Sequence, residues 1–371
     1  MANIALYLAG GGARGAYQAG VLKALSTILN VKKLPFTTIT GVSVGSLNAA
    51  ILAENTDDFP KAVAKLESLW RNIDSSQVFH ASNYSLSKSV LRNVTNFLIN
   101  KGPSGYILDT SPLAQFIHQH IDFDLIAANI NAHKINNLEV ISTCYEAQQT
   151  VSFCHAIPEF KHWQHPRHIS HAVELAPHHI LASSALPLFF PAACIDNLHY
   201  GDGSIGLVSP LRGAIRAQVE KILVIGTRKP STFTSMASLK ASHHTIGFAH
   251  ILGGMLNSVF LDNLDRDIET VNRMNEIARL LSIWKKRHAP WRPIATLNLR
   301  PSTDVASMAQ SHYNQVPALL RFILNLLGAQ GSSGDLLSFL LFEQNFTEPL
   351  IALGESDTLA ASDEVQAFFE S

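Results

Sequence analysis

The sequence is poor in charged residues and cysteine, and it contains no long apolar segment. Its 28 Lys and Arg balance 29 Asp and Glu, so it lacks the basic excess that is typical of nucleic-acid-binding proteins. No apolar run approaches the roughly 18 residues that a membrane-spanning helix needs, and the first residues lack the charged and apolar regions of a signal peptide. We therefore expect a cytoplasmic protein, either soluble or peripherally attached to a membrane.

The cysteines and histidines do not form a metal-binding pattern. Cys144, Cys154 and Cys194 lack Cys-x-x-Cys spacing, which argues against a disulfide framework and a zinc site and favours a reducing compartment. Histidines recur at every third position from 162 to 171, but Pro166 interrupts any helix through them. We predict ordinary core or surface imidazoles there, and no metal.

Acidic residues are absent from the first 53 positions, and this absence bears on a glycine-rich loop. Residues 3–9 read as a buried strand and residues 16–29 as a helix with an apolar stripe. The loop between them fits the Gly-x-Gly-x-x-Gly pattern of dinucleotide-binding proteins, but that function needs an acidic residue about 20 positions further on. We therefore rank nucleotide binding low and expect no cofactor.

The same loop can bind an anion in another way. Consecutive glycines before a helix leave backbone N–H groups free to converge on a negative charge, as an oxyanion hole requires. The candidate residues are Gly10, Gly11, Gly12, Ala13, Arg14 and Gly15. For the Arg14 side chain two interpretations stay open: a clamp on the loop, or a solvated residue in the first helical turn.

Residues 35–53 contain the strongest catalytic signal, a strand, a Gly-x-Ser-x-Gly turn and an Ala-rich helix in succession. This order is typical of a nucleophile elbow, in which a serine lies on a turn so tight that Gly41 and Gly45 are required on either side. Ser43 would then present its hydroxyl at a helix N-terminus, where negative charge is favoured. The alternative is a Gly-Ser turn without chemistry.

Four segments together resemble the patatin-like phospholipases. They are LAGGGARGAYQAGVL, GVSVGSLNAA, HHILASSALPLFFPA at 178–192, and Tyr200 to Ser204. Asp202, Gly203 and Ser204 stand where the family has Asp-Gly-Gly or Asp-Gly-Ala, so Ser204 departs from the usual residue. The resemblance covers about residues 1–228 and implies a three-layer α/β/α fold with a mainly parallel central sheet.

The general base is the open question of the chemistry. A conventional serine hydrolase would place a histidine after Asp202 in the chain, and nothing in the sequence distinguishes the candidates His243, His244, His250, His288 and His312. The resemblance instead implies a dyad, in which Asp202 takes the Ser43 proton directly. Apolar neighbours should raise the pKa of Asp202 by desolvation and make it a better base near neutrality.

The remaining chain reads as scaffold. We expect helices over 61–72 and 86–100 and from Ser111, a strand pair at 138–143 and 150–154, and a buried strand at 219–227. Residues 186–190 either pack against the sheet or form the apolar wall of an acyl-chain site.

The last part of the chain differs in character. We divide the chain into a patatin-like domain, 1–230, and a mainly helical C-terminal extension, 231–371, packed on the core. A helix over 246–281, a short strand at 294–298 and a closing helical run from Leu336 are expected. For the basic, aromatic segment 284–293, contact with membrane headgroups and a solvated turn both stay open.

These observations predict a serine lipid acyl hydrolase of the phospholipase A or lysophospholipase type, acting on a lipid or phospholipid substrate. Two alternatives remain open. An acyltransferase would use the same acyl-enzyme with an alcohol or thiol as acceptor, and a lipid-binding regulator would use the same fold without catalysis. The sequence gives no indication of the oligomeric state.

Overall fold

The computed structural model describes residues 3–80, 106–230, 248–280, 292–313, 316–326 and 334–370. A ten-stranded sheet forms its centre. The strands are β1 (Ile4–Leu8), β2 (Thr38–Val42), β3 (Asn137–Cys144), β4 (Gln149–Ala156), β5 (Gln164–His165), β6 (His168–Ala172), β7 (Ala193–Ile195), β8 (Leu198–Asp202), β9 (Lys221–Ile225) and β10 (Ala295–Leu299).

The sheet is parallel in its central part, in the order β10-β9-β1-β2-β3. β4 and β8 both pair antiparallel with β3, at its two edges, and β7 extends β8. Parallel strands joined by helices bring the carboxyl ends of β1, β2 and β9 to one edge of the sheet, which is where ligands bind in open α/β folds. The predicted adjacency of the first strand and the elbow strand is confirmed.

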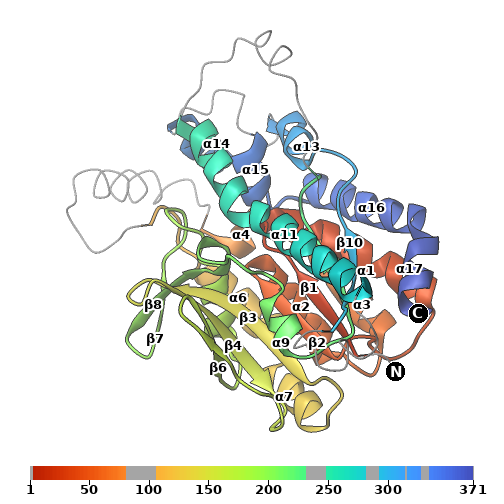
Figure 1. Cartoon of the computed structure of the whole chain (residues 1–371). Helices are drawn as coiled ribbons and strands as arrows, with labels where there is room; N and C mark the ends of the chain where they lie inside the picture. Colours follow the sequence, from red (N-terminus) through yellow and green to blue (C-terminus); the bar gives the residue numbers. More distant parts are fainter. Residues whose placement is uncertain are drawn as a thin grey trace.

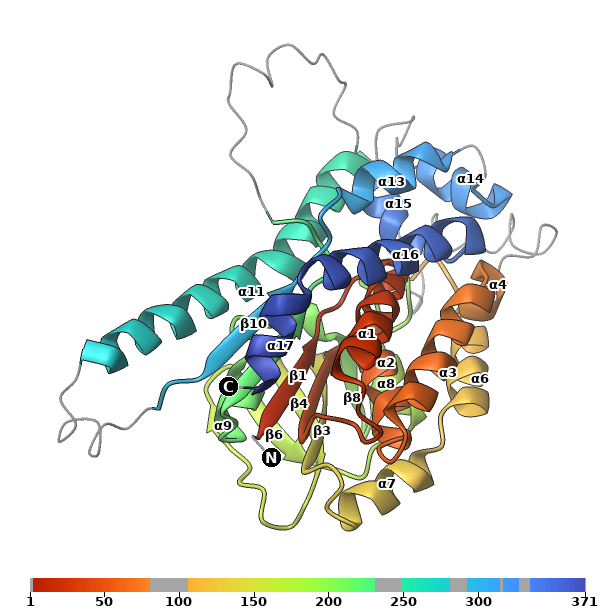
Figure 2. The ribbon, with the colours of Figure 1, turned by 90° about the vertical axis from the view of Figure 1, so that its right-hand side faces the viewer.

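Helices cover both faces of the sheet (Figures 1 and 2). Those before β10 are η1 (Gly12–Gly15), α1 (Ala16–Leu29), α2 (Val44–Glu54), α3 (Phe59–Asn72), α4 (Ser75–Val78), α6 (Ser111–His120), α7 (Phe123–Asn131), α8 (Pro177–Ser183), η2 (Gly203–Ile205), α9 (Arg212–Arg216) and α11 (Phe248–Leu280). Those after it are α13 (Val305–Ser311), α14 (Ala318–Leu326), α15 (Gly334–Leu340), α16 (Gln344–Ala360) and α17 (Ser362–Glu370). None of the described helices is long and apolar enough to cross a membrane.

Alternation of side chains along the strands produces two apolar layers. On β1, Leu6 and Leu8 face the layer beneath α1, α3 and α16, whereas Ala5 and Tyr7 face the layer beneath α9 and the second half of α11. Because both faces are covered, the central strands read as continuous apolar runs in the sequence. The predicted three-layer α/β/α architecture with a mainly parallel sheet is confirmed.

Most of the predicted elements are present. α3 covers the predicted amphipathic helix, α6 begins at Ser111, and β3 and β4 form the predicted antiparallel pair. β9, α11 and β10 correspond to the strand, long helix and short strand expected near the C-terminus. The helix expected over 86–100 lies outside the described residues, as does all of the basic, aromatic segment except Arg292 and Pro293.

Residues beyond 230 contribute directly to the sheet and its cover. β10 pairs in parallel with β9, and α16 packs against α1 (Figure 2). The Lys221 ammonium group on β9 donates a hydrogen bond to the Phe368 carbonyl on α17, at 2.6 Å. Division of the chain at residue 230 stays a prediction, and these contacts show how closely the two parts are joined.

Candidate active site

Ser43 lies on a strained turn between β2 and α2. Its φ of 53° and ψ of −128° place a non-glycine residue in a sparsely populated conformation, as a nucleophile elbow requires. A Cβ on Gly41 would lie 2.4 Å from the Gly45 carbonyl oxygen, and one on Gly45 would lie 2.2 Å from the Leu8 carbonyl oxygen. Both glycines are therefore required by close backbone approach.

Asp202 reaches the same edge of the sheet from the end of β8. Its register partner on β3 is Ser142, next to Ile141, which is in turn paired with Val42 of the elbow strand. Its Oδ1 accepts a hydrogen bond from the Ser204 N–H at 2.9 Å, so the unusual serine at this position still forms the turn. Strand pairing thus brings the predicted nucleophile and base together from positions 159 residues apart.

The Asp202 carboxyl group is completely buried, and its burial raises its pKa from 3.8 to about 6. The nearby Ser43 hydroxyl and Ser204 act on the pKa in the opposite direction, and burial outweighs them. Within the described residues, the Asp202 Oδ2 atom has no hydrogen-bond partner. This oxygen is therefore free to accept a proton.

The glycine-rich loop follows β1 at the same edge. Gly11 and Gly12 have φ values of 155° and 56°, and the loop continues into η1 and α1. The first N–H groups of such a helix have no partner within the helix, which makes them donors for an anion. Gly12 lines the same pocket as Ser43.

Buried side chains hold the start of this loop in place. The Gln18 amide donates to the Ala9 carbonyl at 2.8 Å, and Asn48 of α2 donates to Gln18 at 2.8 Å. The Trp70 indole N–H donates to Asn48 at 3.0 Å. A chain of hydrogen bonds thus joins the loop to α2, the helix that carries the elbow.

The Arg14 side chain is a clamp, and its interpretation as a solvated residue is wrong. It is 2% exposed, and its guanidinium group is directed at the C-terminal part of the chain, where Asn257, Asp335 and Ser338 accept its hydrogen bonds. The sequence could not reveal this, because the partners lie more than 240 residues away.

Ser183 is a functional candidate that the sequence analysis did not single out. Its buried hydroxyl accepts a hydrogen bond from the Ser43 N–H at 2.8 Å and donates one to the Ile141 carbonyl at 2.6 Å. Two residues later, the Ala185 carbonyl accepts a hydrogen bond from the Asp202 N–H at 3.0 Å. One short segment therefore holds the backbones of both Ser43 and Asp202. In the sequence, this role of Ser183 could have been suspected from its position within segment 178–192, which resembles the patatin-like phospholipases.

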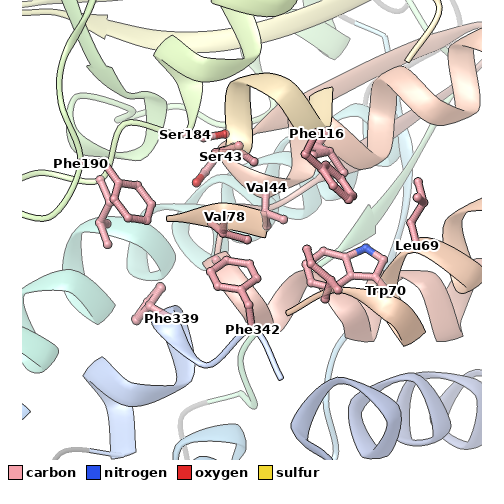
Figure 3. Close-up of a pocket in the computed structure, with 15 residues that line it drawn as sticks. Ser43, Val44, Leu69, Trp70, Val78, Phe116, Ser184, Phe190, Phe339 and Phe342 are labelled. Carbon is pink, nitrogen blue, oxygen red and sulfur yellow. The ribbon is translucent and has the colours of Figure 1, made fainter. Parts of the chain in front are cut away.

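An apolar pocket opens beside Ser43 (Figure 3). Ser184 lies next to Ser43, and most of the other side chains are aliphatic or aromatic. Leu186 and Phe190 line this pocket, whereas Phe189 is buried in the core, so segment 186–190 both packs in the core and contributes to a pocket wall. That this pocket holds an acyl chain stays a prediction. The lining residues are Gly12, Ser43, Val44, Leu47, Leu69, Trp70, Ile73, Val78, Leu113, Phe116, Ser184, Leu186, Phe190, Phe339 and Phe342.

No histidine is among the residues that line this pocket within the described part of the chain. Of the five candidate bases, His243, His244 and His288 lie outside the described residues, as does the side chain of His250 on α11. The His312 ring contacts the Met308 carbonyl and Phe346, away from the pocket lining. The histidines at 162–171 show no metal-binding group among the described residues; His168, for example, is buried against the Ser152 hydroxyl at 2.7 Å.

Three known proteins are similar to parts or all of this chain. Lysophospholipase nte1 of Aspergillus terreus is 37% identical over 75 residues, which are 19% of this chain and 5% of that protein. VipD from Legionella pneumophila aligns over 98% of this chain and 67% of the VipD chain, with 14% identity and a TM-score of 0.40. Human GIVD cytosolic phospholipase A2 aligns over 100% of this chain and 58% of the phospholipase chain, with 12% identity and a TM-score of 0.44. That structure is a complex with methyl gamma-linolenyl fluorophosphonate.

The chain thus spans only a small part of the curated relative that it matches. The match to a family is broader, because the patatin-like phospholipase model covers residues 6–215, more than half of the chain. That range contains the glycine-rich loop, the elbow and Asp202. The chain belongs to the patatin-like phospholipase family.

Proposed function

We propose that this protein is a serine lipid acyl hydrolase that cleaves acyl esters of phospholipids or lysophospholipids through a Ser43–Asp202 dyad. The family supports a lipid hydrolase in general. The observation that carries the specific proposal is the position of a strained, 5% exposed serine at the end of an apolar pocket, close to a buried carboxylate.

In the first half of the reaction, Asp202 accepts the proton of the Ser43 hydroxyl as Oγ attacks the ester carbonyl carbon. The negative charge that develops on the carbonyl oxygen is stabilised by backbone N–H groups of the loop from Gly10 to Gly15, most directly around Gly12. Collapse of this intermediate breaks the ester bond, and the proton passes from Asp202 to the leaving alcohol. The acyl group remains on Ser43.

In the second half, Asp202 takes a proton from water as that water attacks the acyl-enzyme. The fatty acid leaves and Ser43 recovers its proton, so Asp202 ends the cycle as a carboxylate. Burial of Asp202 suits it to this role, because a pKa near 6 gives a stronger base that is still ionised at neutral pH.

The apolar pocket supports an acyl chain as the group bound beside Ser43. Its walls combine aromatic side chains, such as Phe116 and Phe190, with aliphatic ones such as Leu47. Such a lining would bind a hydrocarbon chain and offer little to a polar or charged substituent. The headgroup of the lipid would therefore lie outside this pocket.

The test is hydrolysis of p-nitrophenyl esters and of lysophospholipid by wild type, Ser43→Ala and Asp202→Asn. We expect activity on medium or long acyl chains that is abolished in both variants while the far-UV circular dichroism of each is retained. Unchanged turnover in Ser43→Ala would contradict the proposal. Acceptor alcohols added to the same assay would reveal an acyltransferase by its transfer products.

A further inference from the structure

The family model ends at residue 215, but the glycine-rich loop is held by residues far beyond it. We propose that α15 (Gly334–Leu340) belongs to the catalytic site and that it positions the glycine-rich loop for catalysis through its contacts with Arg14. Arg14, Asp335 and Ser338 are positioning residues in this account, since none of them needs to touch the substrate. The inference rests on the proposed hydrolase function and extends it to the C-terminal part of the chain.

Arg14 connects the loop to α15 through most of its donor groups. Its Nε donates to the Ser338 hydroxyl at 2.9 Å, and its Nη2 approaches the Asp335 carbonyl and carboxylate oxygens at 3.3 and 3.4 Å. Its Nη1 donates to Asn257 of α11 at 3.2 Å. A planar guanidinium group with partners on several sides has its orientation fixed, and this fixes the loop that carries it.

The backbone of α15 also touches the loop directly. A Cβ on Gly12 would lie 2.1 Å from the Phe339 carbonyl oxygen, so the two backbones are in contact. The Phe339 ring lies beneath the Arg14 guanidinium, 4.2 Å from its carbon to the ring centroid, and also lines the pocket of Ser43. Figure 3 shows Phe339 on the blue C-terminal helix, across the pocket from Ser43.

These contacts explain why a charged group is buried here. Removing a guanidinium from water is unfavourable unless charged and polar partners replace the water. Burial lowers the pKa of Arg14 to about 10, and Asp335 acts against this shift. Loss of the partners on α15 would leave a buried charge unsatisfied, and the loop, whose N–H groups must converge on one oxygen, would have to shift to relieve it.

The first test compares wild type, Ser338→Ala, Arg14→Met and the double variant in ester hydrolysis, with active sites counted by fluorophosphonate titration. Ser338→Ala removes one hydrogen bond to a charged donor, and we expect turnover per titrated site to fall about tenfold with little change in KM. Arg14→Met should lower turnover per titrated site further. If Arg14 acts through α15, turnover per titrated site in the double variant is no lower than in Arg14→Met alone.

Thr358→Val is the matched control. Thr358 is a buried hydroxyl on α16 that donates to the Gly354 carbonyl at 2.8 Å, much as Ser338 donates to Asp335, but it is neither a partner of Arg14 nor a residue of the pocket lining. We expect it to alter thermal stability and to leave turnover per titrated site unchanged.

The outcomes separate this inference from the proposed function. If wild type neither turns over ester nor reacts with the fluorophosphonate, the hydrolase proposal itself fails. If wild type is active and Ser338→Ala matches it in turnover per site, or if the losses of the single variants simply add, the positioning role of α15 is overturned while the hydrolase stands. Should Arg14→Met fail to fold, the comparison of Ser338→Ala with Thr358→Val still decides.

Discussion

At the scale of single residues, the environment of Asp202 has opposite effects on catalysis and stability. The proposed base must be ionised, and its pKa is near 6 because its carboxylate is buried. The same burial makes ionisation unfavourable in the folded protein. A residue placed for catalysis can thus reduce the stability of the fold that holds it.

The first prediction concerns the pH dependence of turnover. Because the carboxylate form of Asp202 is the active one, kcat/KM should rise with pH through about 6 and then level off. The measurement is hydrolysis of a non-ionising ester between pH 4.5 and 8.5. A midpoint near 4, the value of an exposed carboxyl group, would show that the buried Asp202 does not limit the reaction.

The same shift predicts that Asp202→Asn stabilises the protein. A carboxyl group whose pKa is raised on folding lowers the free energy of unfolding as pH rises from about 4 to 6, by about 3 kcal/mol in full. We therefore expect Asp202→Asn to increase thermal stability at pH 7.5 and to have little effect at pH 4, where the wild-type group is protonated. Equal effects at both pH values would contradict this explanation.

Ser183 provides the third prediction. In Ser183→Ala the Ser43 N–H loses its acceptor, and the strained turn loses its link to Ile141, so we expect turnover to fall by about tenfold or more. Ser170→Ala is the control, since Ser170 is a buried hydroxyl on β6 whose partners, Cys154 and His162, do not line the pocket. Equal kcat values for the two variants would remove Ser183 from the positioning residues.

At the scale of elements, the segment after α15 forms part of the pocket. Phe342 lines it and lies nearly parallel to the Trp70 ring, with centroids 6.3 Å apart, so a side chain from the C-terminal part packs on one from α3 in the wall of the pocket. The dimensions of the pocket therefore depend on residues from both ends of the chain.

Phe342→Ala should enlarge this pocket and shift the preferred substrate toward longer acyl chains. The measurement is kcat/KM over a series of p-nitrophenyl esters of increasing chain length. Phe368→Ala is the control, since Phe368 is similarly buried, at 7% exposed against 6% for Phe342, but lies on α17 away from the pocket. If both variants keep the wild-type profile, Phe342 does not limit chain length.

At the scale of the whole molecule, the contacts of the C-terminal part predict that residues 1–230 do not fold alone. A Cβ on Gly20 of α1 would lie 1.9 Å from the Ile351 carbonyl oxygen, so α16 is in backbone contact with α1, and β10 covers the edge of β9. Without them, a large apolar surface and an unpaired strand edge would be exposed. A soluble, protease-resistant fragment with cooperative thermal unfolding would contradict this expectation and support an independent domain.

The sequence by itself determined the elements and the chemistry expected at their ends. Strand, glycine turn and helix are local patterns, so β1, β2 and α1 follow from residues within a few positions of one another. The requirement for Gly41 and Gly45 was equally readable, because it arises from steric contact within one turn and its adjoining strand.

The tertiary structure alone decided how distant residues meet. Desolvation of Asp202 was expected from its apolar neighbours in the sequence, but that Ser183 holds the elbow and that Arg14 is bound by α15 depend on packing between segments 140 to 324 residues apart. A hydroxyl or guanidinium group has the same sequence signature whether it is solvated or buried. Its role appears only when the chain has folded, because hydrogen bonding and desolvation depend on distance in space and not along the sequence.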